Sequence, residues 1–312
     1  MLIAQSTKGI TGKPDTSYSN YSAYVSTKKI YPDIKLVHEF HFKSVKEKKN
    51  IIYCTAGDRS LKLDAFYPEQ EYKKGKPAII IVHGGGWRTG NRTQHYPLAQ
   101  QLAHLGYVCF TPEYRLSTEA LYPAAVYDIK SCIRWLHEHA NEYNVDTSKI
   151  VVFGFSAGGE LAAFMGATNS INKFEENKNC WSNTSSLVKA VIDIDGILSF
   201  IHPESGEGDD SKRTSAATYW FGYSKIENPE LWKEGSSLTH VGKHTPPTLF
   251  INSSVARMHA GREDYIKILD QYKIYTEVHE FENAPHSFCL FEPWFQPTVK
   301  YIDDFLKKVF KQ

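Results

Sequence analysis

A serine stands between two glycines at a point where a strand is expected to pass into a helix. The run Gly154-Phe155-Ser156-Ala157-Gly158 follows the β-type residues 150–153 and precedes a small-residue helix that covers 160–164. Such a turn is so tight that its flanking positions tolerate almost no side chain, and it lifts the serine hydroxyl clear of the sheet edge. Because glycine and serine are common in ordinary turns, Ser156 is a candidate nucleophile that needs support from elsewhere in the chain.

A glycine run upstream supplies one such support. The apolar stretch 77–82 is typical of a fully buried strand, and it leads into His83-Gly84-Gly85-Gly86-Trp87. Consecutive glycines leave backbone N–H groups uncovered, and acyl transfer needs such donors for the oxyanion of its tetrahedral intermediate. We predict that the N–H groups of Gly85, Gly86 and Ala157 form this oxyanion hole.

A histidine near the end of the chain supplies the other. His286 lies on a loop after the last expected strand, 275–282, and is the predicted general base for Ser156. Serine first and histidine last is the chain order of the α/β-hydrolase triad. A turn serine, a flexible glycine loop and a surface histidine are ordinary features taken singly, but their coincidence in this order predicts a hydrolase.

On these motifs the chain resembles the HGGG-bearing esterase group of α/β-hydrolases, which includes hormone-sensitive-lipase-like esterases and kynurenine formamidases. The resemblance runs from about Ile51 to Phe310. Within the group, the chain is most similar to bacterial carbohydrate esterases that remove acetyl, methyl or feruloyl esters from plant polysaccharides. The resemblance implies two-step acyl transfer through an acyl-enzyme, which needs neither a cofactor nor a metal.

The acid of the triad departs from the pattern of this group. In most relatives it follows the strand expected here at 247–252, where Val255-Ala256-Arg257 offers no carboxylate. Asp195, at the end of the expected strand 187–194, is the favoured acid, although it could instead cap a turn. Asp264, in the first turn of the next helix, is the alternative, and there an acid would also offset the helix dipole.

Three residues are candidates for contact with the substrate. Trp87 follows the glycine run, where it could form a wall of an acyl or sugar pocket or anchor the loop in the core. Arg257 and His259 lie with Arg262 on the loop that lacks the acid. Guanidinium groups beside an ester site suit a uronate or another carboxylate-bearing substrate, and internal pairing with neighbouring acidic residues is the alternative.

Periodicity predicts the architecture that positions these residues. Runs at 35–42, 50–56 and 61–67 indicate an antiparallel edge that opens the sheet. From residue 77 onward strands and helices alternate, which predicts an α/β-hydrolase fold: a mostly parallel central sheet flanked by helices, with the site beyond the carboxyl ends of the strands. The polar insertion 199–241 contains aromatic residues and predicts a small cap between core strands, or an insertion that these aromatics anchor to the body. Beyond the ranges already given, the expected elements are the strands 78–82 and 107–111 and the helices 96–105, 124–142, 261–272 and 299–310.

Length and composition fit one catalytic domain. The chain has 312 residues and a formal net charge of +1. We expect an N-terminal tail over 1–34 and the catalytic domain over 35–312. The small net charge gives no field for nucleic acid, and no apolar run approaches the roughly 20 residues of a membrane span, so neither a nucleic-acid partner nor a membrane span is expected.

The five cysteines do not form a disulfide framework, because they are odd in number and widely spread. Cys109 and Cys132 stand in apolar patterns and are expected to be buried thiols, which leaves room for one disulfide elsewhere. Met1–Gln5 could be the end of a signal peptide. We therefore expect an exported protein, periplasmic or extracellular.

The expected function is hydrolysis of ester substituents on plant cell-wall oligo- or polysaccharides. An amide hydrolase, formamidase-like or peptidase-like, would use the same machinery. A lipase would need a large apolar acyl channel, and the polar insertion argues against one. A non-catalytic binding protein on the same fold is the remaining alternative, and the absence of an acid after 247–252 is its support.

Overall fold

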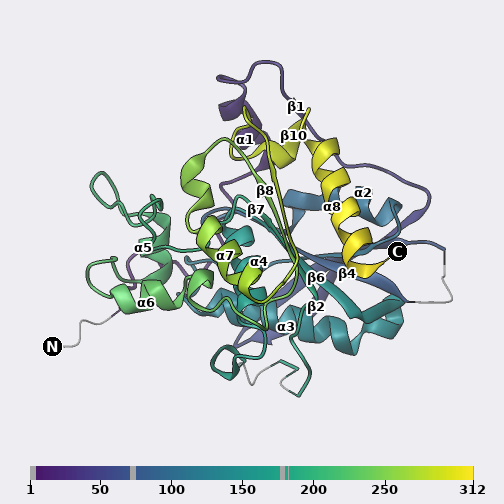
Figure 1. Cartoon of the computed structure of the whole chain (residues 1–312), viewed down its shortest axis with the longest axis horizontal. Helices are drawn as coiled ribbons and strands as arrows, with labels where there is room; N and C mark the ends of the chain where they lie inside the picture. The colour runs from purple at the N-terminus through teal and green to yellow at the C-terminus, as the bar shows by residue number, and fades with distance from the viewer. Residues whose placement is uncertain (1–4, 71–74, 176–179, 182, 312) are drawn as a thin grey trace.

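A twisted, mostly parallel sheet forms the centre of the computed structural model, which describes residues 5–70, 75–175, 180–181 and 183–311 (Figure 1). β2, β3 and β5 pair antiparallel, and every later neighbour pairs parallel. The predicted sheet, with its antiparallel edge, is confirmed. In spatial order the eight strands are β2 Val45–Ala56, β3 Arg59–Pro68, β5 Val108–Pro112, β4 Lys76–Val82, β6 Val145–Phe155, β7 Ala190–Ile194, β8 Thr248–Asn252 and β9 Thr276–Glu280.

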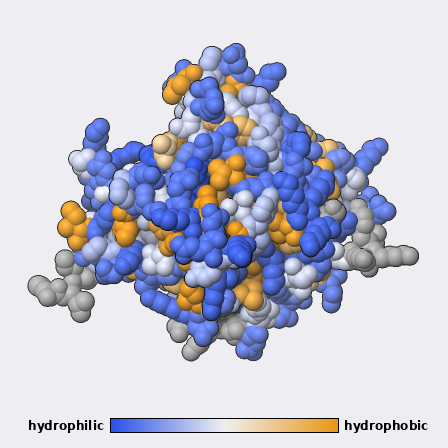
Figure 2. Space-filling view, in the orientation of Figure 1, coloured by the Kyte–Doolittle hydropathy of each residue, from blue (hydrophilic) through white to orange (hydrophobic). Residues whose placement is uncertain are grey.

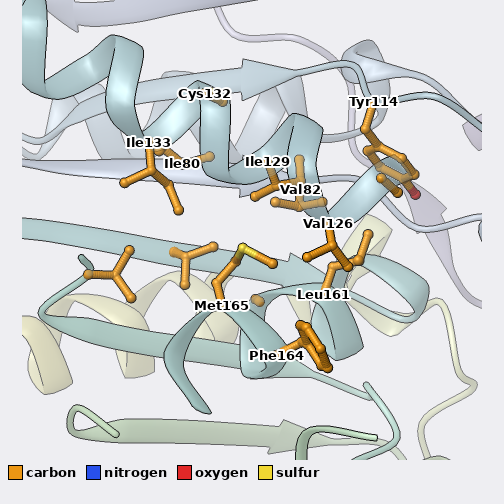
Figure 3. Close-up of a cluster of buried hydrophobic side chains, with 14 of the residues drawn as sticks. Ile80, Val82, Tyr114, Val126, Ile129, Cys132, Ile133, Leu161, Phe164 and Met165 are labelled. Atoms are coloured by element: carbon orange, nitrogen blue, oxygen red, sulfur yellow. The ribbon is translucent and has the colours of Figure 1, made fainter. Parts of the chain in front are cut away.

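Helices cover both faces of this sheet because the central strands are apolar on both sides. In β4, Ile79 and Ile81 pack with the helices α2 and α8, whereas Ile80 and Val82 pack with α3 and α4. Burial of each such side chain contributes roughly 1.5–3 kcal/mol. Figure 3 shows the second of these clusters, where side chains of α3 and α4 meet those of β4. The helices are α2 Tyr96–His104, α3 Ala124–Glu138, α4 Ala157–Ala167, α7 Arg262–Gln271 and α8 Phe295–Phe310.

The prediction of a sheet strand over 35–42 is wrong. Only β1, Lys35–Leu36, is extended, and it pairs with β10, Phe291–Glu292, in a separate two-stranded sheet. The aromatic residues that gave this segment its β-rich pattern pack elsewhere: Phe40 stacks on Phe42 and on Phe295 of α8. Side-chain burial against a helix therefore produced a pattern that resembles a strand.

The N-terminal segment predicted as a tail lies against the body. It contains the short helix α1, Asn20–Thr27, which Ser19 caps, and Asp15 forms an isolated bridge with Thr89. Residues 1–4, most of the stretch interpreted as the end of a signal peptide, lie outside the described residues.

The insertion 199–241 carries two short helices, α5 Ala216–Phe221 and α6 Pro229–Glu234, which lie side by side at the end of the molecule remote from α8 (Figure 1). Its aromatic residues anchor it to the body. Trp220 stacks on Trp87 of the glycine run, with ring centroids 5.0 Å apart, and Trp232 packs against Phe221.

The visible surface is largely hydrophilic, with apolar residues in small scattered groups (Figure 2). In the part of the chain that the structure describes, no helix combines the length and the apolar character needed to cross a bilayer.

One disulfide joins Cys54 of β2 to Cys180, across a sequence separation of 126 residues. Cys109, Cys132 and Cys289 are free and buried, which confirms the prediction of buried thiols for the first two. The bond ties the antiparallel edge of the sheet to the segment that follows α4.

Loss of this disulfide should lower the free energy of unfolding by about 2–5 kcal/mol, because the cross-link restricts the unfolded chain. We expect the double variant Cys54→Ser/Cys180→Ser to show this loss in urea unfolding. Dithiothreitol should reproduce it in the wild type and leave the variant unchanged. Equal stability of the two proteins without reductant would contradict the bond.

Candidate active site

The predicted nucleophile lies on a strained turn between β6 and α4. Ser156 has φ 57° and ψ −122°, a conformation that costs a non-glycine residue on the order of 1–3 kcal/mol and persists only where the surroundings enforce it. Its N–H donates to the Ile194 carbonyl at 2.8 Å. A Cβ on Gly154 would lie 1.8 Å from the Gly158 carbonyl oxygen, so the turn requires glycine there. The sharp turn exposes the serine hydroxyl at the sheet edge, as the motif predicts.

The structure brings Ser156, His286 and Asp195 into one hydrogen-bonded row. His286 Nε2 lies 2.8 Å from Ser156 Oγ, and His286 Nδ1 lies 2.9 Å from Asp195 Oδ2. Ionised Asp195 can only accept, so the imidazole donates from Nδ1 and its Nε2 accepts from the serine hydroxyl. This tautomer leaves Nε2 ready to take the serine proton.

Asp195 is completely buried, yet it remains ionised. Burial by itself would raise the pKa of Asp195, but the imidazoles of His259 and His286 and the side chain of Ser253 hold it at about 2. Oδ1 accepts from Ser253 N at 2.8 Å and from Asn252 Nδ2 at 3.4 Å. Sequence reasoning missed Asn252 and Ser253. Their position could have indicated this role: they lie at the carboxyl end of β8, and β8 is the parallel neighbour of β7, which Asp195 follows.

The alternative acid lies elsewhere. Asp264 is largely exposed in the first turn of α7, and its Oδ2 lies 3.5 Å from His202 Nε2. His286 instead faces Asp195 from a loop 91 residues away in sequence. The geometry therefore supports Asp195 as the partner of His286 and gives Asp264 a surface contact.

Two of the three predicted oxyanion donors border the reacting hydroxyl. Gly86 and Ala157 line the cavity that contains Ser156 and His286. Gly85 turns the loop: its carbonyl accepts the N–H groups of Arg88 and Thr89, and a Cβ on it would lie 2.0 Å from the Thr89 carbonyl oxygen.

Gln94, which sequence reasoning did not select, fixes the start of the glycine run. Its Oε1 accepts the N–H of Gly84 at 2.7 Å. Because the glycines have few side-chain contacts of their own, this bond helps to hold the loop in one conformation.

Trp87 both forms a wall of the cavity and anchors the glycine loop in the core, the two roles that its position suggests. It lines the cavity beside Ser156, but only 4% of it is exposed. Its indole N–H donates to the carboxyl group of Glu160 at 3.0 Å. Burial raises the pKa of Glu160 well above its usual range, so this carboxyl can hold the indole without bringing a charge beneath the site.

Of the two interpretations of the arginines after β8, internal pairing holds for Arg262. Arg262 is engaged internally with Glu263, Glu280 and Asn252. Arg257 remains half exposed at the cavity, and its Nη1 lies 3.2 Å from Glu207 Oε1. Sequence reasoning missed Glu207, because nothing local in the polar insertion distinguishes it from its acidic neighbours.

His259, predicted as a substrate contact, faces the acid instead. Its Nε2 lies 3.7 Å from Asp195 Oδ1, and its side chain borders a separate cleft beside the cavity.

The cavity in front of Ser156 has a volume of about 200 Å³. Its walls are mostly apolar, with the Glu207–Arg257 pair as the charged part. A cavity of this size with few polar groups suits a small ligand. The lining residues are Gly86, Trp87, Ser156, Ala157, Ile197, Glu207, Ala216, Arg257, Met258 and His286.

Comparison with known proteins agrees with this geometry. The sequence model of the BD-FAE family matches residues 63–257, which is more than half of the chain and includes the glycine run and the elbow. The chain belongs to the BD-FAE family. Esterase LipC of Mycobacterium tuberculosis is 27% identical over 215 residues, which cover 66% of this chain and 50% of LipC. The chain spans about half the length of the curated relatives that it matches.

Solved structures share the fold of this BD-FAE member. A truncated carbohydrate esterase from gut microbiota superposes with a TM-score of 0.72 at 23% identity, over 88% of this chain and 100% of that one. The butyrate-bound thermophilic esterase Est2 of Thermogutta terrifontis gives 0.69 at 25% identity, over 86% of this chain and 95% of that one. The predicted α/β-hydrolase fold and the resemblance to esterases of this group are confirmed.

The contacts of Asp195 and Asp264 predict opposite effects for the two acid-to-amide changes. Asp195→Asn should lower kcat on an aryl acetate by up to about 10⁴ near pH 7, because an amide favours the wrong imidazole tautomer. Asp264→Asn, the matched control, should keep its rate and change stability by less than about 1 kcal/mol. Steady-state kinetics and thermal unfolding of both variants would decide, and the reverse order of rates would move the acid to α7.

Proposed function

We propose that this protein is a serine carboxylesterase that works through an acyl-enzyme. The row Asp195–His286–Ser156, with distances of 2.9 and 2.8 Å, is the observation that carries the proposal. Ser156 Oγ attacks the ester carbonyl carbon as His286 Nε2 takes its proton, and N–H groups at Gly86 and Ala157 bind the oxyanion. The bond to the alcohol then breaks and His286 protonates the alcohol. A water molecule, deprotonated by His286, then attacks the acyl-enzyme in the same way, which releases the acid and restores the serine.

The size of the cavity supports a short acyl group. Ile197, Ala216 and Met258 close a space of about 200 Å³ around Ser156, whereas a lipase needs a long apolar channel. The butyrate-bound Thermogutta terrifontis esterase is a relative of the same fold that holds a small acid.

The charged pair at the cavity supports a saccharide as the alcohol part of the substrate. Glu207 can accept hydrogen bonds from sugar hydroxyls, and Arg257 can donate them. Because Glu207 already offsets the charge of Arg257, neutral hydroxyl groups suit this pair better than a uronate. The carbohydrate esterase among the structural relatives is consistent with this class. The proposed substrates are short acyl esters on plant cell-wall oligo- or polysaccharides. Methyl esters, in which the saccharide is the acyl part, fit the small cavity less well.

The disulfide Cys54–Cys180 supports export to the periplasm or the cell exterior. Disulfides form and persist in oxidising compartments and are rare in the cytosol of mesophiles. We therefore propose that the enzyme acts on material outside the cytoplasm.

Replacement of Ser156 by alanine should abolish turnover. We expect kcat on p-nitrophenyl acetate to fall at least about a thousandfold while the fold survives, because the hydroxyl is the proposed nucleophile. The same preparations should be assayed on N-formylkynurenine and peptidyl anilides. Retention of more than about a tenth of kcat would exclude Ser156 as the nucleophile, and faster turnover of the amides than of the ester would favour an amide hydrolase.

Arg257→Gln and Glu207→Gln should lower the preference for sugar esters. Loss of a hydrogen bond to a charged group costs about 1.5–3 kcal/mol, so the ratio of kcat/KM on acetylated xylo-oligosaccharides to that on p-nitrophenyl acetate should fall at least about tenfold. Arg213→Gln, the same change at an exposed arginine of the insertion, is the control. Release of acetate, methanol and ferulate from native xylans and pectins identifies the ester. An unchanged ratio in both variants would remove the pair from substrate recognition.

A further inference from the structure

A second histidine faces the triad carboxylate. His259 ends the 3₁₀ turn η5, Ala256–His259, which follows β8. Its Nε2 lies 3.7 Å from Asp195 Oδ1, while His286 Nδ1 lies 2.9 Å from Oδ2. The two imidazoles therefore face different oxygens of the same carboxylate.

His259 Nε2 is buried and has no hydrogen-bond partner within the described residues. A buried polar atom without a partner is costly, and the nearest acceptor that the structure records for this nitrogen is Asp195 Oδ1. A movement of less than about 1 Å would bring the two atoms to hydrogen-bond distance. Among the described residues, Oδ1 accepts from Ser253 N at 2.8 Å and from Asn252 Nδ2 at the long distance of 3.4 Å. One oxygen offers about two lone-pair sites, so an N–H from His259 competes only with the weaker of these two contacts.

We propose that His259 is a positioning residue that holds Asp195 against His286 by donating its Nε2–H to Oδ1. The inference rests on the proposed esterase function and adds to it a residue that controls the acid. An N–H on Oδ1 adds to the bonds from Ser253 and Asn252 that restrain the rotation of the carboxylate. It also draws negative charge away from Oδ2, so that Asp195 stabilises the protonated form of His286 less in the resting enzyme.

The other charged groups around His259 largely offset one another. The cleft of about 310 Å³ that its side chain borders is also lined by Glu204 of the insertion, Arg257 of the same turn, and Arg262 and Glu263 of α7. Two carboxylates and two guanidinium groups leave Asp195 as the charge that Nε2 faces directly. Removal of His259 should therefore act through Asp195 rather than through the surface.

Two substitutions separate the hydrogen bond that His259 donates from the packing of its ring. His259→Phe keeps a flat ring and removes the donor, whereas His259→Gln keeps an N–H donor. We expect His259→Phe to lower kcat on p-nitrophenyl acetate about five- to tenfold with little change in KM, and to move the acid limb of the kcat/KM profile upward by about half a pH unit. His259→Gln should recover most of both effects. His202→Phe is the matched control, because His202 faces Glu204 and Asp264 instead of Asp195.

A second measurement does not depend on turnover. The proton that His286 Nδ1 shares with Asp195 can be followed by proton NMR in the resting protein, and its pH titration should move upward in His259→Phe but not in His202→Phe. This signal tests the proposal even if no ester is hydrolysed, so failure of the proposed function and failure of this inference are distinguishable. Identical titrations in the wild type and His259→Phe would overturn the inference, as would equal loss of kcat in the Phe and Gln variants with an unmoved acid limb.

Discussion

The buried carboxylate of Asp195 is the constraint on which the candidate site depends. An ion taken out of water is expensive unless its oxygens are paired, and the groups that meet Asp195 come from separate parts of the chain. Asn252 ends β8, Ser253 follows it, and His286 follows β9. They reach one carboxylate because β7, β8 and β9 are parallel neighbours in register, with Ile194 opposite Ile251 and Ile251 opposite His279. If the register of one of these strands shifted, Asp195 would remain buried without its partners and His286 would lose its hydrogen bond to the acid.

A second buried carboxyl group links the elbow to the cap. Glu160, in the first turn of α4, accepts from the indole of Trp87, and Trp87 stacks on Trp220 of α5. The glycine loop would otherwise have little to hold it, since three of its residues lack side chains. The contacts from Glu160 through Trp87 to Trp220 make the aromatic residues of the insertion part of the core. The insertion therefore forms a fixed wall of the cavity. Ala216, at the start of α5, lines the cavity for the same reason.

The features that sequence predicted well are those that local sterics dictate. The elbow around Ser156 requires glycine at positions 154 and 158, and the burial of β4 on both faces follows from its unbroken run of apolar residues. Asp195 could be preferred to Asp264 because parallel strands bring their carboxyl ends to one edge. The pairing of Arg257 with Glu207 and that of Arg262 with Glu280 could not be read from the chain, since these partners lie 50 and 18 residues away. The pairing of Arg262 with its neighbour Glu263 was the alternative that the sequence offered. The pattern of 35–42 misled for a related reason: burial against α8 produces the same alternation as burial in a sheet.

The position of Asp195 determines which contacts the residues of the turn after β8 can make. With Asp195 at the end of β7, the turn Ala256–His259 is free of the task of supplying a carboxylate. Arg257 and Met258 line the cavity in front of Ser156, and His259 faces Asp195 from behind it. Two residues that line the cavity and one that faces Asp195 thus follow one another along one short 3₁₀ turn, in which adjacent side chains must point in different directions. A substitution that rotates this turn would change the walls of the cavity and the surroundings of Asp195 together, which couples the shape of the cavity to the position of the acid.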